Sequence, residues 1–157
     1  MTNVILNLTQ HPASAEQKEA GVIDLTPDFQ RKLKELLTFE QLPTCEKIKY
    51  RVSGICELVV DFCLHPNSPI KDEVRNLILD KDGEVDEVEF KKLDLKFMIG
   101  GAPFLMGPLE SELSYMGKVY YAFSKRVVEE TTGPDGSVVK KTIFRHEGFV
   151  PACLNYR

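Results

Sequence analysis

Short hydrophobic runs alternate along the chain with longer stretches whose apolar residues recur at helical spacing. The runs NVILNL (3–8), LKFMI (95–99) and KVYYAFS (118–124) are short and rich in aliphatic and aromatic residues, which is typical of strands. The first of them is apolar enough to be buried on both faces. Strands that alternate with helices form βαβ units. The pattern therefore predicts a Rossmann-like α/β fold, with a mainly parallel sheet flanked by helices.

Start and stop signals bound the predicted helices. Ser14 followed by Gln17 has the spacing of a capping box, and Gly21 closes the short helix that it begins. Thr26 and Thr44 stand at the N-cap positions of the next two helices. The expected helices are 15–20, one from Pro27, one from 45 to His65-Pro66-Asn67, a short one at 70–79, and one at 103–116 that stops at Gly117.

The C-terminal part of the chain predicts a β-hairpin. The runs VVEETT and SVVKKTIF are rich in β-branched residues and flank a Gly-Pro-Asp-Gly turn. This hairpin is expected to extend the sheet as an antiparallel edge.

The segment 67–93 differs from the rest because it is polar and acidic. We interpret it as an insertion within a single domain that spans 1–157. Its run DKDGEVDEVEF departs from the EF-hand calcium loop, since Val85 stands where that loop requires glycine. A solvated acidic turn is the preferred interpretation.

The net charge of -4 argues against broad binding to the backbone of long nucleic acids. No run approaches the roughly 20 apolar residues of a membrane helix, so we expect no membrane contact and a cytoplasmic location. The cysteines show no CxxC spacing, and Cys56 and Cys63 share a helix face. Buried, reduced thiols suit them better than a zinc site or a disulfide framework.

Polar or glycine-rich residues follow each predicted strand. In open α/β sheets, ligands bind beyond the carboxyl ends of the strands. The candidate ligand-binding residues are Thr9, Gln10 and His11 after the first strand, Gly100, Gly101 and Ala102 after the second, and Ser124, Lys125 and Arg126 after the third. Arg145 and His146, near the end of the hairpin, are expected to reach the same rim.

These residue types suit an anionic ligand. Two glycines allow backbone amides to approach it, and the helix start after Ala102 adds partial positive charge. Lys125 and Arg126 supply full charges, and a histidine such as His11 exchanges protons near neutral pH. No Asp, Glu or His cluster has metal-ligand spacing, so neither a metal nor another cofactor is expected.

Each feature also has a purely structural interpretation. A Gly-Gly pair is most often a turn, and a histidine at a strand end often bonds to the backbone. Lys125 and Arg126 can protect an edge strand against aggregation. The convergence of three strand ends on one edge of the sheet is what favours a ligand pocket.

Four stretches carry a resemblance to a family of small, largely uncharacterised proteins of bacteria and their phages. They are ILNLTQHPASAEQKEAGVIDL (5–25), MIGGAPFLMGPLESEL (98–113), YAFSKRVVEE (121–130) and DGSVVKKTIFRHEGFV (135–150). More weakly, the chain is similar to the small Rossmann-like ring nucleases associated with type III CRISPR systems. That likeness lies in size, in the histidine segment after the first strand, and in the glycine loop before a helix.

The second resemblance implies a protein that binds a small nucleotide and cleaves cyclic oligonucleotide messengers without a metal. His11 would be the general acid or base, and the Gly100 and Gly101 amides would stabilise the reacting phosphate together with Lys125 or Arg126. A two-fold cyclic ligand would favour a homodimer. The alternatives are a sponge that binds a nucleotide without chemistry, and a protein-interaction module of a mobile element.

Overall fold

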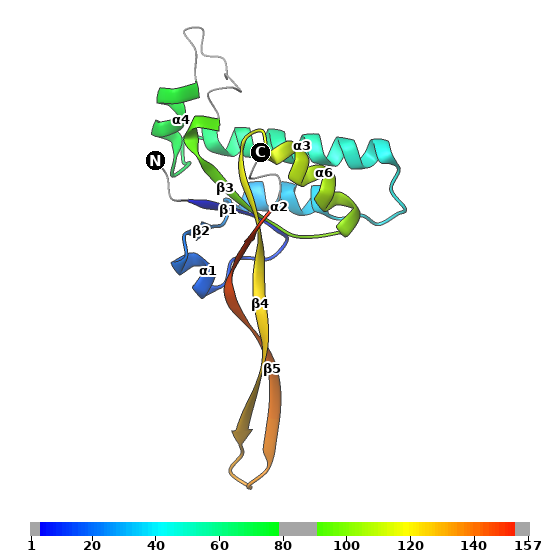
Figure 1. The fold of residues 1–157 in the computed structure, drawn as a ribbon, viewed down its shortest axis with the longest axis vertical. Helices are drawn as coiled ribbons and strands as arrows, with labels where there is room; N and C mark the ends of the chain where they lie inside the picture. Colours follow the sequence, from blue (N-terminus) through cyan, green and yellow to red (C-terminus); the bar gives the residue numbers. More distant parts are fainter. Residues whose placement is uncertain (1–3, 79–90, 153–157) are drawn as a thin grey trace.

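Five strands form one sheet, in the order β2-β1-β3-β4-β5, in the computed structural model, which describes residues 4–78 and 91–152 (Figure 1). The strands are β1 (Ile5–Leu8), β2 (Val22–Ile23), β3 (Leu95–Ile99), β4 (Gly117–Thr132) and β5 (Val138–Pro151). Neighbours from β2 to β4 are parallel, and β5 is antiparallel to β4. The predicted Rossmann-like α/β fold with a C-terminal hairpin is confirmed. The sequence pattern does not reveal β2, because two residues carry no periodicity.

The helices begin largely where the capping signals predict. They are α1 (Ala15–Glu19), α2 (Pro27–Leu37), α3 (Cys45–Leu64), α4 (Lys71–Ile78), α6 (Pro103–Leu113) and the short 3-10 helix η1 (Lys91–Leu93). The Ser14 hydroxyl accepts from the Gln17 amide at 3.1 Å, and the Gln17 side chain accepts from the Ser14 amide at 3.0 Å. Thr44 caps α3, whereas the Thr26 side chain makes no capping bond to α2. The capping box is thus confirmed in both directions.

The end of α6 differs from the prediction. The helix ends at Leu113, before the expected Met116, and Gly117 is the first residue of β4 instead of a helix stop. In β4, Gly117 pairs with Leu95 of β3, and a Cβ at Gly117 would lie 2.3 Å from the Leu95 carbonyl oxygen. The glycine is therefore needed for a close approach of two strands.

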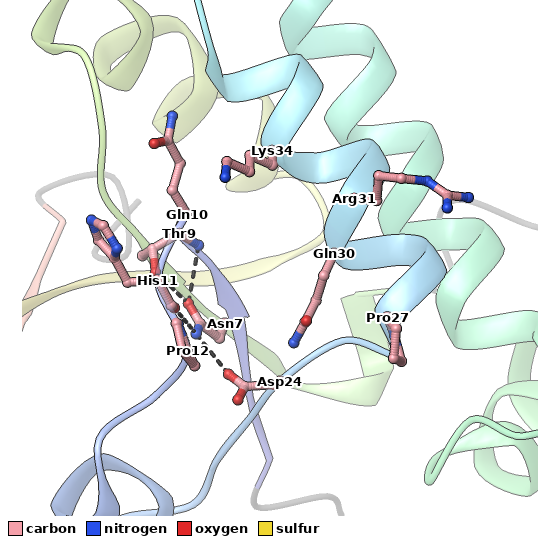
Figure 2. A pocket seen from close by; sticks show the side chains of 10 residues that line it. All are labelled: Asn7, Thr9, Gln10, His11, Pro12, Asp24, Pro27, Gln30, Arg31 and Lys34. Atoms are coloured by element: carbon pink, nitrogen blue, oxygen red, sulfur yellow. Dashed lines mark hydrogen bonds between the residues drawn. The ribbon is translucent and has the colours of Figure 1, made fainter.

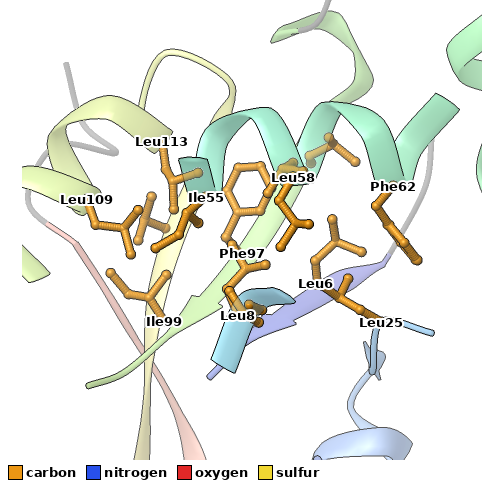
Figure 3. Packing of buried hydrophobic residues seen from close by; sticks show 14 of the residues in the cluster. Leu6, Leu8, Leu25, Ile55, Leu58, Phe62, Phe97, Ile99, Leu109 and Leu113 are labelled. Atoms are coloured by element: carbon orange, nitrogen blue, oxygen red, sulfur yellow. The ribbon is translucent and has the colours of Figure 1, made fainter. Parts of the chain in front are cut away.

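The main core lies between the sheet and the layer of α2, α3 and α6 (Figure 3). Leu6 and Leu8 of β1 and Phe97 of β3 are fully buried against side chains such as Ile55 of α3 and Leu109 of α6. A smaller cluster occupies the other face, and its members are Ile5, Ala13, Val22 and Met98, with Phe149 packed against them. β1 is therefore buried on both faces, as its sequence predicts.

β4 continues far beyond the parallel part of the sheet. The predicted end of this strand at Ser124 is wrong, because β4 pairs with β5 without a break in the strand as far as Thr132. A bulge between Phe123 and Ser124 shifts the register but does not end the strand. Beyond the last pair with β3, at Tyr121, the two strands project from the body of the protein (Figure 1).

Cys56 and Cys63 of α3 are free thiols, as predicted. No disulfide joins the described cysteines, and Cys63 is buried while Cys56 is half-buried. Burial raises the pKa of the Cys63 thiol to about 12. Burial, followed by the carboxylates of Glu112 and Glu57, raises the pKa of Cys56 to about 11. Both thiols keep their protons at neutral pH and are poor nucleophiles.

The predicted acidic segment, 67–93, is described only at its two ends. It begins with α4, which matches the predicted short helix, and it ends with η1. The predicted acidic turn within 79–90 lies outside the described residues. In the parts of the chain that the structure describes, no helix is long and apolar enough to cross a membrane.

Candidate functional site

The strand order creates a crevice between β1 and β3. The chain leaves β1 towards β2 on one side and later returns to place β3 on the other side. The loops after β1 and β3 therefore diverge at their carboxyl ends, which is where open α/β sheets bind ligands. The first loop carries Thr9, Gln10 and His11, and the second carries Gly100, Gly101 and Ala102. The structure thus brings together the first two of the three predicted groups.

A buried amide fixes the loop after β1. The Asn7 side-chain nitrogen donates to the His11 carbonyl and to the Asp24 carboxylate, each at 2.8 Å. Its oxygen accepts from the Thr9 amide at 3.0 Å and from the Thr9 hydroxyl at 2.7 Å. Asp24 accepts in turn from the Ala13 amide at 2.9 Å. This network, which no local sequence signal indicates, ties the loop to β1 and to Asp24.

The network changes the expected role of Thr9. Its hydroxyl proton lies within hydrogen-bonding distance of the Asn7 oxygen and the His11 carbonyl, so it serves the loop itself. Thr9 is therefore positioned as part of the scaffold and is a poor donor to a ligand. The imidazole of His11 is exposed, and it points away from the Asn7 amide in Figure 2.

A wide groove of about 750 Å³ lies between the two loops. Its walls are the loop after β1, the glycine loop after β3, the end of α2 and the start of β4, with Thr9, Gln10, His11, Gly100, Gly101, Ala102, Thr38, Phe39, Phe104 and Tyr121 among the lining residues. Gly101 has φ 152°, a backbone conformation that favours glycine. A side chain there would be strained and would also contact Met106, so glycine leaves this wall unstrained and bare.

An aromatic pair borders the groove. The rings of Phe39 and Phe104 meet edge to face, with centroids 5.0 Å apart, and 46% of Phe104 is exposed. Arg51 lies 4.8 Å from the centre of the Phe39 ring and donates to the Thr38 carbonyl at 2.8 Å, which fixes the end of α2. The pair joins two segments far apart in the sequence, so spacing alone does not predict it.

A smaller hollow of about 290 Å³ lies on the α2 side of the same loop (Figure 2). Gln10 and His11 line both hollows, and Lys34 and Arg31 of α2 line the smaller one. The Lys34 ammonium points toward Gln10, whose amide donates to the Thr38 hydroxyl at 3.3 Å. Positive charge at the crevice therefore comes from α2 and not from the predicted Lys125 and Arg126.

A tyrosine–carboxylate pair closes the β4 side of the groove. The Tyr121 hydroxyl donates to Glu110 of α6 at 2.9 Å. Burial, and then the hydrogen bond to this carboxylate, raise the pKa of Tyr121 to about 12. Tyr121 thus remains protonated at neutral pH and is available as a neutral contact.

The other predicted residues lie on the projecting hairpin. Ser124, Lys125 and Arg126 are exposed mid-strand residues of β4, because the strand does not end there, and none lines the groove. Arg145 pairs with Glu129 at 3.5 Å. The His146 ring packs against Phe149, with centroids 4.8 Å apart, and its Nδ1 is buried without a hydrogen-bond partner.

We searched the described parts of the chain for side chains that could bind a metal ion together. Among residues 4–78 and 91–152, no group of three or more His, Cys, Asp or Glu side chains is placed to hold a metal ion. The residues that line the crevice provide hydrogen-bonding groups, aromatic rings and a few lysine and arginine charges.

The strand order defines an open α/β protein. Its groove lies at the switch point of the sheet, between β1 and β3, where successive connections run in opposite directions. The chain belongs to the Uncharacterized protein MJ1673 family, whose pattern it matches over residues 69–150. No curated protein and no solved structure matches the chain. The matched range includes the glycine loop, the hairpin and most of the predicted insertion, whereas the loop after β1 precedes it.

Proposed function

We propose that this protein binds a small nucleotide in the groove between the loops after β1 and β3. The observation that carries the proposal is one groove, at the switch point, that combines a glycine-rich wall with an aromatic pair whose Phe104 ring is exposed. A nucleotide needs both, because its phosphate is polar and its base has two apolar faces. The groove of about 750 Å³ has the size of a small-molecule site.

The aromatic pair supplies the base contact. The exposed side of Phe104 offers a ring against which a base stacks, while Phe39 supports the ring from its edge. Stacking on an aromatic side chain contributes about 1–3 kcal/mol per base and tolerates all four bases. The aromatic contact alone therefore gives affinity without selecting the base.

The phosphate contact comes from the polar side of the loops. Gly100 and Gly101 expose backbone where larger residues would place a Cβ, and α6 begins directly after them. Lys34 lines the smaller hollow, points toward Gln10, which lines both hollows, and adds a positive charge there. With few cations at the crevice, a ligand with one or two phosphates fits better than a polyphosphate.

Phe104→Ala is expected to weaken nucleotide binding about tenfold, because it removes the stacking ring. The measurement is isothermal titration of the pure protein with AMP, ADP-ribose and cyclic di-, tri- and tetra-adenylate. Tyr115→Ala is the matched control, since Tyr115 is 70% exposed just beyond the other end of α6 and outside the groove. Equal affinity of Phe104→Ala and the wild type, or no binding by any probe, would contradict the proposal.

Cleavage of a cyclic oligonucleotide is the second candidate, and His11 is the observation that favours it. Its imidazole is exposed at the wall shared by both hollows, on a loop whose backbone the Asn7 amide holds. In such a reaction a ribose 2′-hydroxyl attacks the adjacent phosphate, the bond to the 5′-oxygen breaks, and a cyclic phosphate forms. His11 would accept the hydroxyl proton or supply one to the leaving oxygen.

His11→Ala is expected to lower the cleavage rate about 100-fold or more, while leaving affinity for the same ring within about threefold. Products are separated by chromatography after incubation with cyclic tri- and tetra-adenylate. Binding without products in the wild type would indicate a sponge. Undiminished cleavage by the variant would remove His11 from the mechanism.

A further inference from the structure

The hairpin beyond the sheet is exposed on both faces. We call residues 123–132 and 138–148 the ribbon. Its strands pair only with each other, because β3 pairs with β4 no further than Tyr121. α1 reaches only the base of the ribbon, where the His146 amide donates to the Glu16 carboxylate at 3.2 Å, and no described helix covers the rest (Figure 1). A two-stranded hairpin without a covering layer is marginally stable in water.

The two faces of the ribbon are unlike each other. Residues that pair across the strands share a face, so Val127 and Ile143 lie on one side, where both are half-buried. Arg145 pairs with Lys125, two residues before Val127, and Glu129 lies two residues after Val127, so the Arg145–Glu129 ion pair at 3.5 Å spans this apolar pair. We call this side the covered face, because the Arg145–Glu129 pair partly shields Val127 and Ile143 from solvent.

The opposite face, which we call the open face, leaves its apolar residues in solvent. Val128 lies diagonally across the strands from Phe144, and they are 56% and 73% exposed. Arg126 and Glu130 flank Val128 at two residues on either side, and Phe144 and Lys140 flank Thr142 in the same way. Within the described residues, Arg126 has no ion-pair partner, while Glu130 pairs with Lys140 at 3.5 Å.

This arrangement is complementary to itself when one copy is reversed. Consider two ribbons packed face to face, with a two-fold axis that lies between them, perpendicular to the strands and level with Val128. This axis places each Arg126 opposite Glu130 of the second copy. The same axis places each Phe144 opposite Lys140 of the second copy, a cation–π contact, and joins the two Val128 side chains. A two-fold interface requires this kind of self-complementary patch.

We propose that the open face packs against the open face of a second copy, with the two ribbons antiparallel. The residues that form it are Arg126, Val128, Glu130, Lys140 and Phe144. A nucleic acid suits this face less well, because three Asp and Glu of the ribbon offset most of its five Lys and Arg. Packing would cover Phe144 and Val128 and give the ribbon the second layer that it lacks.

The test reverses the charge of Arg126 or of Glu130 and measures the molar mass of each variant in solution by sedimentation equilibrium. Arg126→Glu and Glu130→Arg each place like charges opposite one another in a homodimer, and each is expected to raise the dissociation constant at least about tenfold. A one-to-one mixture of the two variants restores both opposite-charge pairs, so dimers are expected to return. That recovery also shows that both variants are folded.

Lys125→Glu is the matched control, because it makes the same charge change at the adjacent residue on the covered face. It is expected to dimerise like the wild type. A wild-type chain that stays monomeric up to about 1 mM, an equal effect of Lys125→Glu, or no recovery in the mixture would each overturn the proposal. Nucleotide binding is measured separately, so it stands or falls independently of this interface.

Discussion

Replacing Gly117 with alanine is expected to lower the free energy of unfolding by about 3 kcal/mol or more. The added Cβ would lie 2.3 Å from the Leu95 carbonyl oxygen and 2.9 Å from its carbonyl carbon. These are backbone atoms of a strand held between β1 and β4, so they cannot move aside without breaking ladder bonds. Urea denaturation followed by circular dichroism gives the difference.

Gly107→Ala is the control for the glycine-to-alanine change itself. Nothing lies within 4 Å of the Cβ position at Gly107, which is in the interior of α6. Alanine there is expected to leave stability unchanged or to raise it by about 0.5–1 kcal/mol. Equal stability of Gly117→Ala and the wild type would show that β3 and β4 are not packed as closely as described.

Asn7→Asp is expected to cost about 3 kcal/mol at pH 7 and to weaken nucleotide binding as well. The change keeps the size of the side chain but removes the donor to the His11 carbonyl and to Asp24. It also places a second carboxylate against Asp24. The loop after β1 then loses the bonds that fix it, and with them the shape of the groove.

The loss of stability in Asn7→Asp is expected to depend on pH. The neighbouring carboxylate and burial raise the folded-state pKa of the introduced group above its unfolded value of about 4. The folded state then binds more protons than the unfolded state, so the deficit relative to the wild type grows as pH rises above about 4. Urea titrations at several pH values measure this. Asn67→Asp, at an exposed position, is the control and is expected to show neither effect.

Local signals account for the features that the sequence predicts. The Ser14–Gln17 box and Thr44 act within one helical turn, so their residues reveal the helix starts directly. The glycine loop is predicted for the same reason, since it follows the compact apolar run of β3. The carboxyl-edge location of the groove follows from alternating strands and helices.

Contacts between distant segments account for what the sequence does not predict. In the sequence, Asn7 is not distinguished from other strand residues. Its role follows from its hydrogen bonds to Asp24 and to the His11 carbonyl, which only the fold brings close. Phe39 meets Phe104 only after α2 and α6 pack on the same face. The strand end placed at Ser124 is wrong because the strand continues into VVEETT, the first strand of the predicted hairpin, and the polar residues between the two apolar runs do not reveal this continuity.

The sheet joins strands at very different distances along the chain. β4 and β5 meet across a short turn, whereas Ile5 of β1 pairs with Lys96 of β3 only after most of the intervening chain has been gathered in. Closing that long loop costs more entropy than closing the hairpin, so we expect the hairpin to form early in folding and the β1–β3 pair to form late. The crevice lies at that late pair. The proposed nucleotide binding is therefore expected only of the completely folded chain, and its recovery is expected to report refolding yield more stringently than strand or helix content does.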